Sequence, residues 1–164
     1  MQETVQHLTE NEARYLKLIY RAFEEARQLG TTDIARSLGI RPASVTEVLQ
    51  TLHSKGLVLY RRYRKVEITE LGIKTARKLL RRHRVLEVYF ANILKCGPEE
   101  ACAEASRLDF HISDRAINAI CRTYGHPNFC PCGKPVFPGP DCRSERSGNP
   151  KPHSHRDIEE GGRP

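Results

Sequence analysis

The chain has 164 residues, of which 38% are hydrophobic and 29% are charged. This length allows one domain or two small ones, and the composition fits a soluble globular protein with a modest core. The sequence holds no run of about 18 apolar residues, so we expect no membrane span. Its polar, acidic beginning MQETVQHLTENEA lacks the character of a secretory signal. We therefore expect a cytoplasmic protein.

The cysteines and the basic residues bear on function. Six cysteines in a cytoplasmic chain are expected to be buried thiols, metal ligands or redox groups rather than a disulfide framework. The formal net charge is +7, and residues 55–84 hold eleven Lys and Arg against two Glu. Such a local excess indicates a polyanionic partner, most simply nucleic acid, although a solvated helix face has the same composition.

The first predicted helix begins at the sequence TENE. There Thr9 and Glu12 form a capping box, in which their side chains satisfy open backbone donors at the helix start. We expect the helix to end at Gly30. Its apolar face, at the spacing i, i+3, i+4 and i+7, is formed by Leu16, Ile19, Tyr20 and Phe23.

The stretch TTDIARSLGIRPASVTEVLQTLHSKG predicts two further short helices. Thr32 is the expected cap of the first helix, and Gly39 is its end. Pro42 suits the first position of the second helix, because the N–H that proline lacks would be unpaired there, and Lys55 and Gly56 end this helix. Its buried stripe is predicted to be Val45, Val48, Leu49 and Leu52. Two short helices joined by a glycine-containing turn form a helix-turn-helix.

The next stretch, GLVLYRRYRKVEITELG, predicts a basic hairpin. LVLY and KVEIT have the composition of two short strands, with RRYRK between them, so the helix-turn-helix carries a wing. The second helix would enter the major groove of DNA. Its exposed face is predicted to comprise Arg41, Ser44, Thr46, Glu47, Gln50 and Thr51. The wing would contact phosphates, which position a protein without reading sequence, through Arg61, Arg62, Arg64 and Lys65.

A long helical pattern begins at Thr69 with TELGIKTARKLLRRHRVLEVYFANIL. Its apolar stripe is longer than a winged helix needs, so we expect the distal half to pack against other helices or a second subunit. Two more helices follow, the second with Ser113 as its cap and Gly125 as its end. From residue 139 to 164 the only aliphatic residue is Ile158. Such a segment cannot bury enough apolar surface to offset the entropy of ordering it, which predicts a disordered tail.

Several separated blocks of the chain resemble one known family. YLKLIY, TTDIARSLGIRPASVTEVLQTLHSKGLV, YRKVEITELG, LLRRHRVLEVYF and EASRLDFHISD are similar, in order and spacing, to the diphtheria-toxin-repressor family of iron- and manganese-dependent prokaryotic transcription repressors. The resemblance covers about residues 11–137. It implies a sequence-specific transcriptional regulator of the repressor type that binds palindromic operators in double-stranded DNA as a homodimer. Some members add an SH3-like domain, for which this chain is too short.

The resemblance gives the expected architecture. We predict a mainly α fold, with a winged-helix DNA-binding domain at 1–70, a helical dimerisation and metal-sensing-like domain at 71–138, and the tail at 139–164. The family's principal metal site would correspond to positions Arg14, Ser106, Asp109 and Phe110. Of these only Asp109 is a competent ligand, so this site looks lost. Arg14, with Lys17 one turn on, could replace the metal by an ion pair to Asp109.

The family's second metal site corresponds to His83, Glu87 and Cys102. His83 and Glu87 stand four residues apart, which places them one turn apart on one helix face. All three side chains can bind a divalent metal, for which the candidates are iron, manganese and zinc. A thiolate in place of the family's imidazole favours zinc or iron(II) over manganese.

The segment HPNFCPCGKP leaves an alternative open. His126, Cys130, Cys132 and Cys142 could hold zinc or an iron–sulfur cluster, which would make the protein a thiol-based sensor on the same fold. The segment also resembles a connecting segment of the family, with Cys132 where a histidine is usual. The chain shows no nucleophile with a base, no paired carboxylates and no phosphate loop, so we do not expect an enzyme. A winged helix used for protein or RNA contact is a further alternative.

Overall fold

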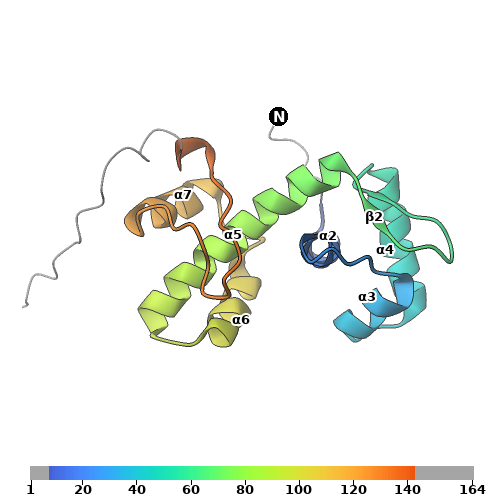
Figure 1. The fold of residues 1–164 in the computed structure, drawn as a ribbon, viewed down its shortest axis with the longest axis horizontal. Helices are drawn as coiled ribbons and strands as arrows, with labels where there is room; N and C mark the ends of the chain where they lie inside the picture. Colours follow the sequence, from blue (N-terminus) through green and yellow to red (C-terminus); the bar gives the residue numbers. More distant parts are fainter. Residues whose placement is uncertain (1–7, 143–164) are drawn as a thin grey trace, which may run out of the picture.

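The computed structural model describes residues 8–142 and shows two lobes joined by one long helix, α5 (Glu70–Leu94) (Figure 1). The first lobe holds α2 (Glu10–Glu24), α3 (Thr31–Leu38), α4 (Pro42–Ser54) and two short strands. The second holds α6 (Pro98–Leu108), α7 (Asp114–Thr123) and the segment that follows them. The predicted fold class, a winged helix-turn-helix followed by a helical domain, is confirmed.

Helix α2 begins as predicted and ends earlier. The Thr9 side chain accepts from the Glu12 N–H, and the Glu12 carboxylate accepts from the Thr9 N–H, which completes the capping box. Gly30 is not its end, because Ala26 takes a left-handed conformation with φ 53° and its N–H returns to the Phe23 carbonyl. This turn closes the helix at Glu24. The predicted apolar face is buried except at Phe23, whose side chain is exposed.

The helix-turn-helix also forms as predicted, with one change of cap. Gly30, rather than Thr32, precedes the first turn of α3, because the Asp33 carboxylate accepts from the Gly30 N–H at 2.8 Å. Gly39 ends α3 with φ 67°, a conformation that glycine adopts without strain. Pro42 opens α4, which buries Val45, Leu49 and Leu52 completely and Val48 in part.

The wing is a two-stranded antiparallel hairpin, β1 (Val58–Leu59) and β2 (Glu67–Ile68). Val58 pairs with Ile68, and the strands are shorter than the predicted ones. The hairpin packs closely on the first turn of α5. A Cβ atom placed on Gly72 would lie 2.0 Å from the Leu57 carbonyl oxygen, so only glycine allows this approach.

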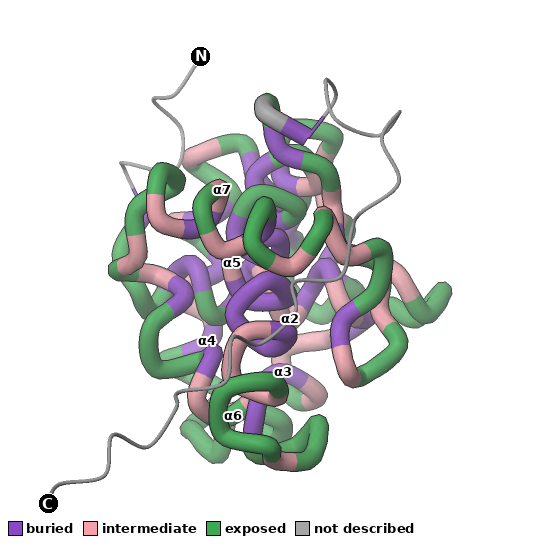
Figure 2. Tube along the Cα trace, turned by 90° about the vertical axis from the view of Figure 1, so that its left-hand side faces the viewer, coloured by how far each residue is buried: buried purple, intermediate pink, exposed green. Residues whose placement is uncertain are grey.

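Helix α5 belongs to two hydrophobic cores. Its first half contributes Ala76, Leu79 and Leu80 to the core of the first lobe. Its second half contributes Val85, Leu86 and Val88 to a separate core with α6, α7 and the segment after α7. In Figure 2 the buried segments gather in the middle of the molecule, around α2 and α5. This explains why the predicted stripe was longer than a winged helix needs.

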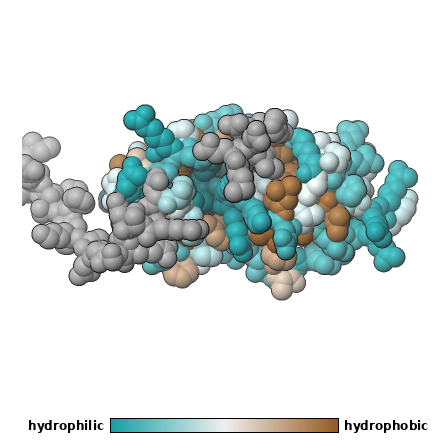
Figure 3. Space-filling view, turned by 90° about the horizontal axis from the view of Figure 1, so that it is seen from above, coloured by the Kyte–Doolittle hydropathy of each residue, from teal (hydrophilic) through white to brown (hydrophobic). Residues whose placement is uncertain are grey.

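The surface has a few apolar places. The face in Figure 3 is largely hydrophilic, with hydrophobic side chains gathered near its middle. At the end of α5, Ile93 and Leu94 are 57% and 48% exposed. No helix among residues 8–142 has the length and apolar character needed to cross a bilayer.

The predicted tail begins with ordered structure. Residues Pro140–Cys142 form one turn of 3-10 helix, and the Cys142 side chain is buried. The average composition of residues 139–164 did not predict this turn, because a single buried cysteine changes that average little. The rest of the predicted tail lies outside the described residues.

Candidate DNA-binding surface and metal centre

The exposed face of α4 carries residues predicted to read DNA. Val45 and Leu49 are fully buried in the first lobe, so the opposite face of the helix is turned to solvent. The predicted DNA-reading residues that are exposed on or beside this helix are Arg41, Ser44, Glu47 and Gln50. An exposed helix face of this kind can enter a major groove without unfolding the domain.

Thr46 and Thr51 differ from the other residues predicted for this face. Both are half-buried. The Thr46 hydroxyl donates to the Pro42 carbonyl at 3.2 Å, and the Thr51 hydroxyl donates to the Glu47 carbonyl at 3.1 Å. Their single hydroxyl donors are therefore used within α4, and only acceptor positions and methyl groups remain to face DNA.

The wing turn between the strands is exposed and basic. Arg61, Arg62 and Arg64 are all exposed, and the Tyr63 ring is 95% exposed. Lys65 is different, because its Nζ lies 2.8 Å from the Asp33 carboxylate. That hydrogen bond, together with one from the Gly30 N–H, lowers the pKa of Asp33. The three arginines therefore offer their charges to phosphates more freely than Lys65 does.

Three predicted metal ligands meet between α5 and α6. His83 Nε2 lies 3.3 Å from Glu87 Oε1 and 3.4 Å from Cys102 Sγ. The ligand atoms of all three residues lie within 4.8 Å of one another. His83 and Glu87 are buried, and Cys102 is half-buried. Tetrahedral zinc, with bonds of roughly 2.0–2.3 Å, would have donor-to-donor edges of about 3.3–3.8 Å, which these separations match.

Two more cysteines complete this group, and sequence reasoning had not placed them there. The Cys132 thiol donates to Glu87 Oε1 at 3.3 Å. Glu87, Cys130 and Cys132 form a second set of potential ligands within 4.8 Å of one another. The spacing CPC signalled metal chemistry, but only the fold shows that Glu87 is its neighbour. We call the whole group the α5 centre, which comprises His83, Glu87, Cys102, Cys130 and Cys132.

The charges of the α5 centre compensate one another. Burial disfavours protonation of His83, but hydrogen bonds to Asp109, Cys102 and Glu87 outweigh it and raise the pKa of His83 to about 9. Burial also opposes ionisation of Glu87, but the hydrogen bond from His83 lowers the pKa of Glu87 to about 2. Burial and the nearby Glu87 charge raise the pKa of Cys132 to about 12. A proton on His83 thus supplies positive charge where a divalent ion would supply it.

Asp109 lies beside the other nitrogen of His83. Its Oδ2 is 2.9 Å from His83 Nδ1, whereas Nε2 points to Glu87 and Cys102. A carboxylate on the outer ring nitrogen fixes the tautomer and the orientation of a ligating histidine. Asp109, predicted as a ligand, is therefore placed to orient His83 and stands apart from the converging donors.

Lys17, not Arg14, pairs with Asp109. The Lys17 ammonium and the Asp109 carboxylate form an ion pair whose side chains are 13% and 3% exposed. Arg14 is exposed, as is Ser106, and Phe110 packs against the core of the first lobe. Within residues 8–142, no group of three potential metal ligands includes Asp109. The residues present do not fit the metal that the resemblance would place here.

Helix α2 links the two lobes through buried and half-buried ion pairs. Besides Lys17–Asp109, the Glu24 carboxylate accepts from Arg84 of α5, with Nη1 to Oε1 at 3.0 Å. At its other end, Glu12 Oε2 lies 2.6 Å from the Lys55 Nζ at the end of α4. The position of α4 is therefore connected through α2 to the surroundings of the α5 centre.

The alternative cysteine and histidine set divides into two groups. Cys130 and Cys132 face Glu87 in the α5 centre, whereas His126 and Cys142 meet Cys121 of α7. A single site containing all four predicted residues is therefore wrong. The turn at 130–133 and the helix α7 direct the two pairs to different places.

Known proteins resemble the chain in both lobes. Residues 7–66 match the family model of the iron dependent repressor N-terminal DNA-binding domain, and residues 69–138 match that of the iron dependent repressor metal-binding and dimerisation domain. The chain is 33% identical to the uncharacterised HTH-type transcriptional regulator MJ0568 of Methanocaldococcus jannaschii over 107 residues, which are 65% of this chain and 86% of that protein. It is 31% identical to the HTH-type transcriptional regulator MntR of Bacillus subtilis over 106 residues, 65% of this chain and 74% of that one.

A solved structure extends the similarity to the arrangement of both lobes. The structure of a manganese-dependent transcriptional repressor in complex with manganese is similar with a TM-score of 0.72 and 32% sequence identity. The match covers 80% of this chain and 60% of that one, so the present chain spans less than two thirds of the solved repressor.

Proposed function

The chain belongs to the iron-dependent repressor family and is a DNA-binding transcriptional regulator, and we propose that it is a repressor whose DNA affinity responds to a metal ion held in the α5 centre. The family consists of transcription regulators, so the chain is not an enzyme. Its second family model is a metal-binding and dimerisation domain, in keeping with a homodimer. The observation that carries the proposal is that two sets of potential ligands, which share the buried Glu87, lie together beside α5.

The DNA partner follows from the first lobe. We propose that α4 enters the major groove through its exposed face and that the wing arginines contact flanking phosphates. Two copies in a homodimer would present two such helices related by a two-fold axis. Their operator would accordingly be palindromic in double-stranded DNA, since operator symmetry mirrors the symmetry of the dimer.

The donors of the α5 centre suit a borderline divalent ion. The centre offers one imidazole, one carboxylate and cysteine thiols. Thiolates favour zinc or iron(II), whereas manganese prefers oxygen donors. We therefore propose zinc or iron(II) as the effector, although manganese is the ion named for the solved relative. A bound ion would supply the positive charge that the His83 proton otherwise supplies.

The residues around the centre provide a route to the DNA-reading helix. His83 must present a neutral Nε2 to a metal, and its Nδ1–H then donates to Asp109. Asp109 is held by Lys17 of α2. The α2 helix is tied in turn to the end of α4 by the Glu12–Lys55 pair. A change in the position or charge of His83 therefore acts on α2 and, through it, on the orientation of α4.

The Lys17–Asp109 pair has a separate role in this proposal. It connects α2 to α6 where the resemblance would place the principal metal. A buried ion pair holds these helices together at all metal concentrations. We propose that this link is permanent and that only the α5 centre responds to metal.

Operator binding with and without metal tests the proposed function. Footprinting on the promoter of the protein's own gene locates the operator, and affinity is then measured after chelation and after adding zinc or iron(II). Wild-type protein should lose affinity on chelation and regain it with either ion. Cys102→Ser should bind the operator with the same affinity in the presence and absence of metal. Cys96→Ser is the control, because the Cys96 thiol contacts only the Phe90 carbonyl among the described contacts, and it should behave as wild type. If the operator affinity of the wild type does not change on chelation, the proposed response to metal is wrong.

A further inference from the structure

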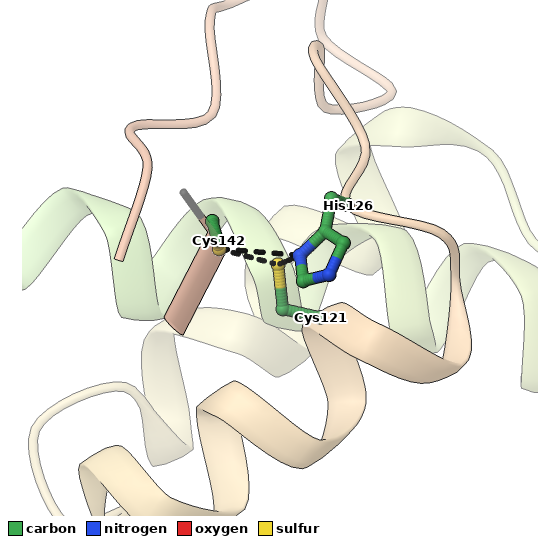
Figure 4. Close-up of side chains that lie close together, drawn as sticks. All are labelled: Cys121, His126 and Cys142. Carbon is green, nitrogen blue, oxygen red and sulfur yellow. Dashed lines mark hydrogen bonds between the residues drawn. The ribbon is translucent and has the colours of Figure 1, made fainter. Parts of the chain in front are cut away.

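A second group of potential metal ligands lies away from the α5 centre. Cys121 is on α7, His126 follows the end of that helix, and Cys142 ends the 3-10 turn. Figure 4 shows the two thiols and the imidazole directed toward one another. Their ligand atoms lie within 4.8 Å of one another. The site is thus assembled from one helix and a chain segment that returns to it 21 residues later.

The separations between the donor atoms match those around a zinc ion. Cys121 Sγ lies 3.8 Å from Cys142 Sγ and 3.5 Å from His126 Nδ1. His126 Nδ1 lies 3.2 Å from Cys142 Sγ. A tetrahedral ion with Zn–S bonds of about 2.3 Å and Zn–N bonds of about 2.0 Å has S–S edges of about 3.8 Å and S–N edges of about 3.5 Å. Two of the three edges agree closely, and the third needs a small widening.

Burial shields the group from solvent, and a neighbouring charge favours the thiolate form of its cysteines. Cys121 and Cys142 are 2% and 3% exposed, and His126 is half-buried. The buried Arg81 guanidinium places Nη2 at 3.6 Å from Cys142 Sγ. Its Nε has no hydrogen-bond partner in the described part of the chain. Because buried charges need compensation, this cation indicates that negative charge develops at the thiols.

Backbone hydrogen bonds help to bring the donors together at the core of the second lobe. The His126 N–H donates to the Cys121 carbonyl at 2.9 Å, which closes the end of α7. The Cys142 N–H donates to the Gly139 carbonyl at 3.1 Å. Gly139 itself passes so close to Arg81 that a Cβ atom there would lie 2.3 Å from Nη2. Residues 139–142 thus pass over α5 toward α7.

We propose that Cys121, His126 and Cys142 bind a zinc ion that fastens residues 139–142 to α7. Two thiolates and one imidazole favour zinc over manganese, and three protein ligands leave one position for water or another ligand. Binding releases the two thiol protons to solvent and makes no change of oxidation state. The site is separate from the α5 centre, since it shares no residue with it.

Zinc stoichiometry of the full chain tests this site. Reduced protein is equilibrated with buffered Zn²⁺ and its zinc content is measured per chain. Wild type should hold one ion at each of the two groups. Cys121→Ser and His126→Asn should each lose one equivalent and keep the other, and Cys102→Ser should lose the equivalent of the α5 centre. Cys96→Ser is the matched control and should keep both.

His126→Asn guards against a variant that fails to fold. His126 has a φ of 54°, a conformation that asparagine tolerates well, and both thiols remain in place. Substitution of Co²⁺ for Zn²⁺ adds a second readout, because tetrahedral cobalt–thiolate bands should weaken in Cys121→Ser. Full zinc content in folded Cys121→Ser and His126→Asn would overturn the proposal. So would a Cys121–Cys142 disulfide in freshly isolated protein that excludes zinc from the site.

Discussion

The surface predicted to read DNA and the α5 centre hold polar side chains in opposite environments. On α4 and the wing, residues such as Gln50 and Arg62 are exposed. In the α5 centre and beside it, His83, Glu87 and Asp109 are buried, and each is hydrogen-bonded to another ionisable group. Exposed charges are screened by water and salt, whereas buried ones depend on their partners. Disturbing the buried region should therefore cost more than disturbing the surface.

The difference in burial also suits the two regions to different tasks, recognition and coupling. The surface must remain available to a partner, so its residues can each be changed with a local effect. The buried network connects α5, α6 and α2, so a change in one member alters the charge balance of the others. The first region is suited to recognition and the second to coupling. Four substitutions test this contrast, in order of decreasing effect.

Replacing Lys17 by methionine should have the largest effect on stability. The change leaves the buried Asp109 carboxylate with His83 as its one ionisable partner among residues 8–142. Removing one member of a buried pair costs several kcal/mol, and we expect a loss of about 3 kcal/mol in the free energy of unfolding. Denaturant titration measures this loss. Arg14→Met, on the exposed side of α2, should change it by less than about 0.5 kcal/mol; equal losses would contradict the assignment of Lys17.

Replacing Asp109 by asparagine should weaken metal binding at the α5 centre. The amide can still contact His83 but no longer offers a charged acceptor to its Nδ1–H. Partners that orient a ligating histidine typically contribute about 10–100-fold to metal affinity, so we expect a loss of that size. Competition with a zinc chelator of known affinity measures it. Unchanged affinity would mean that His83 is oriented by packing alone.

Replacing Gln50 by alanine should relax base specificity. A good bidentate contact between a glutamine and adenine contributes about 1–3 kcal/mol of discrimination against the wrong base. We expect the variant to lose about this much preference at one operator position while its binding to unrelated DNA is retained. Affinities for operators with single base changes report the loss. An equal loss for all sequences would show that Gln50 contacts only the backbone.

Replacing Arg62 by alanine should have the smallest effect. One lost phosphate contact reduces the slope of log affinity against log salt by about 0.9. Binding should weaken evenly across DNA sequences. Lys65→Ala should change the slope less, because Lys65 is already paired with Asp33. A larger change for Lys65 than for Arg62 would reverse this ranking of the wing residues.

The predictability of the two regions differs for the same physical reason. The helix-turn-helix was predictable because its signals are local: the Thr9 capping box, Gly39, Pro42 and a stripe of apolar side chains at helical spacing. The exposed face of α4 then follows from the helical repeat. The ends that were wrong, at Gly30 and Thr32, depended on an Asp33 side chain and a left-handed Ala26.

The metal ligands required more than local spacing. His83 and Glu87 could be paired from their positions one turn apart, and Cys102 came from the resemblance to a family. Cys130 and Cys132 could not be placed, because their approach to Glu87 joins residues more than 40 positions apart. Lys17 and Arg14 are both basic residues on the same helix, and only packing decides which of them reaches Asp109.

By itself the sequence determined the helices, the wing and the basic surface, since periodicity, caps and charge act over a few residues. The family of regulators came from the resemblance of separated sequence blocks to known repressors. The tertiary structure decided which polar groups meet. It placed His126 and Cys142 in one group of potential ligands and Cys130 and Cys132 in another. It also paired Lys17 with Asp109. Such contacts form where elements far apart in the sequence pack together. The strength of an ion pair or a metal site depends on interatomic distances, which the spacing of residues along the chain does not give.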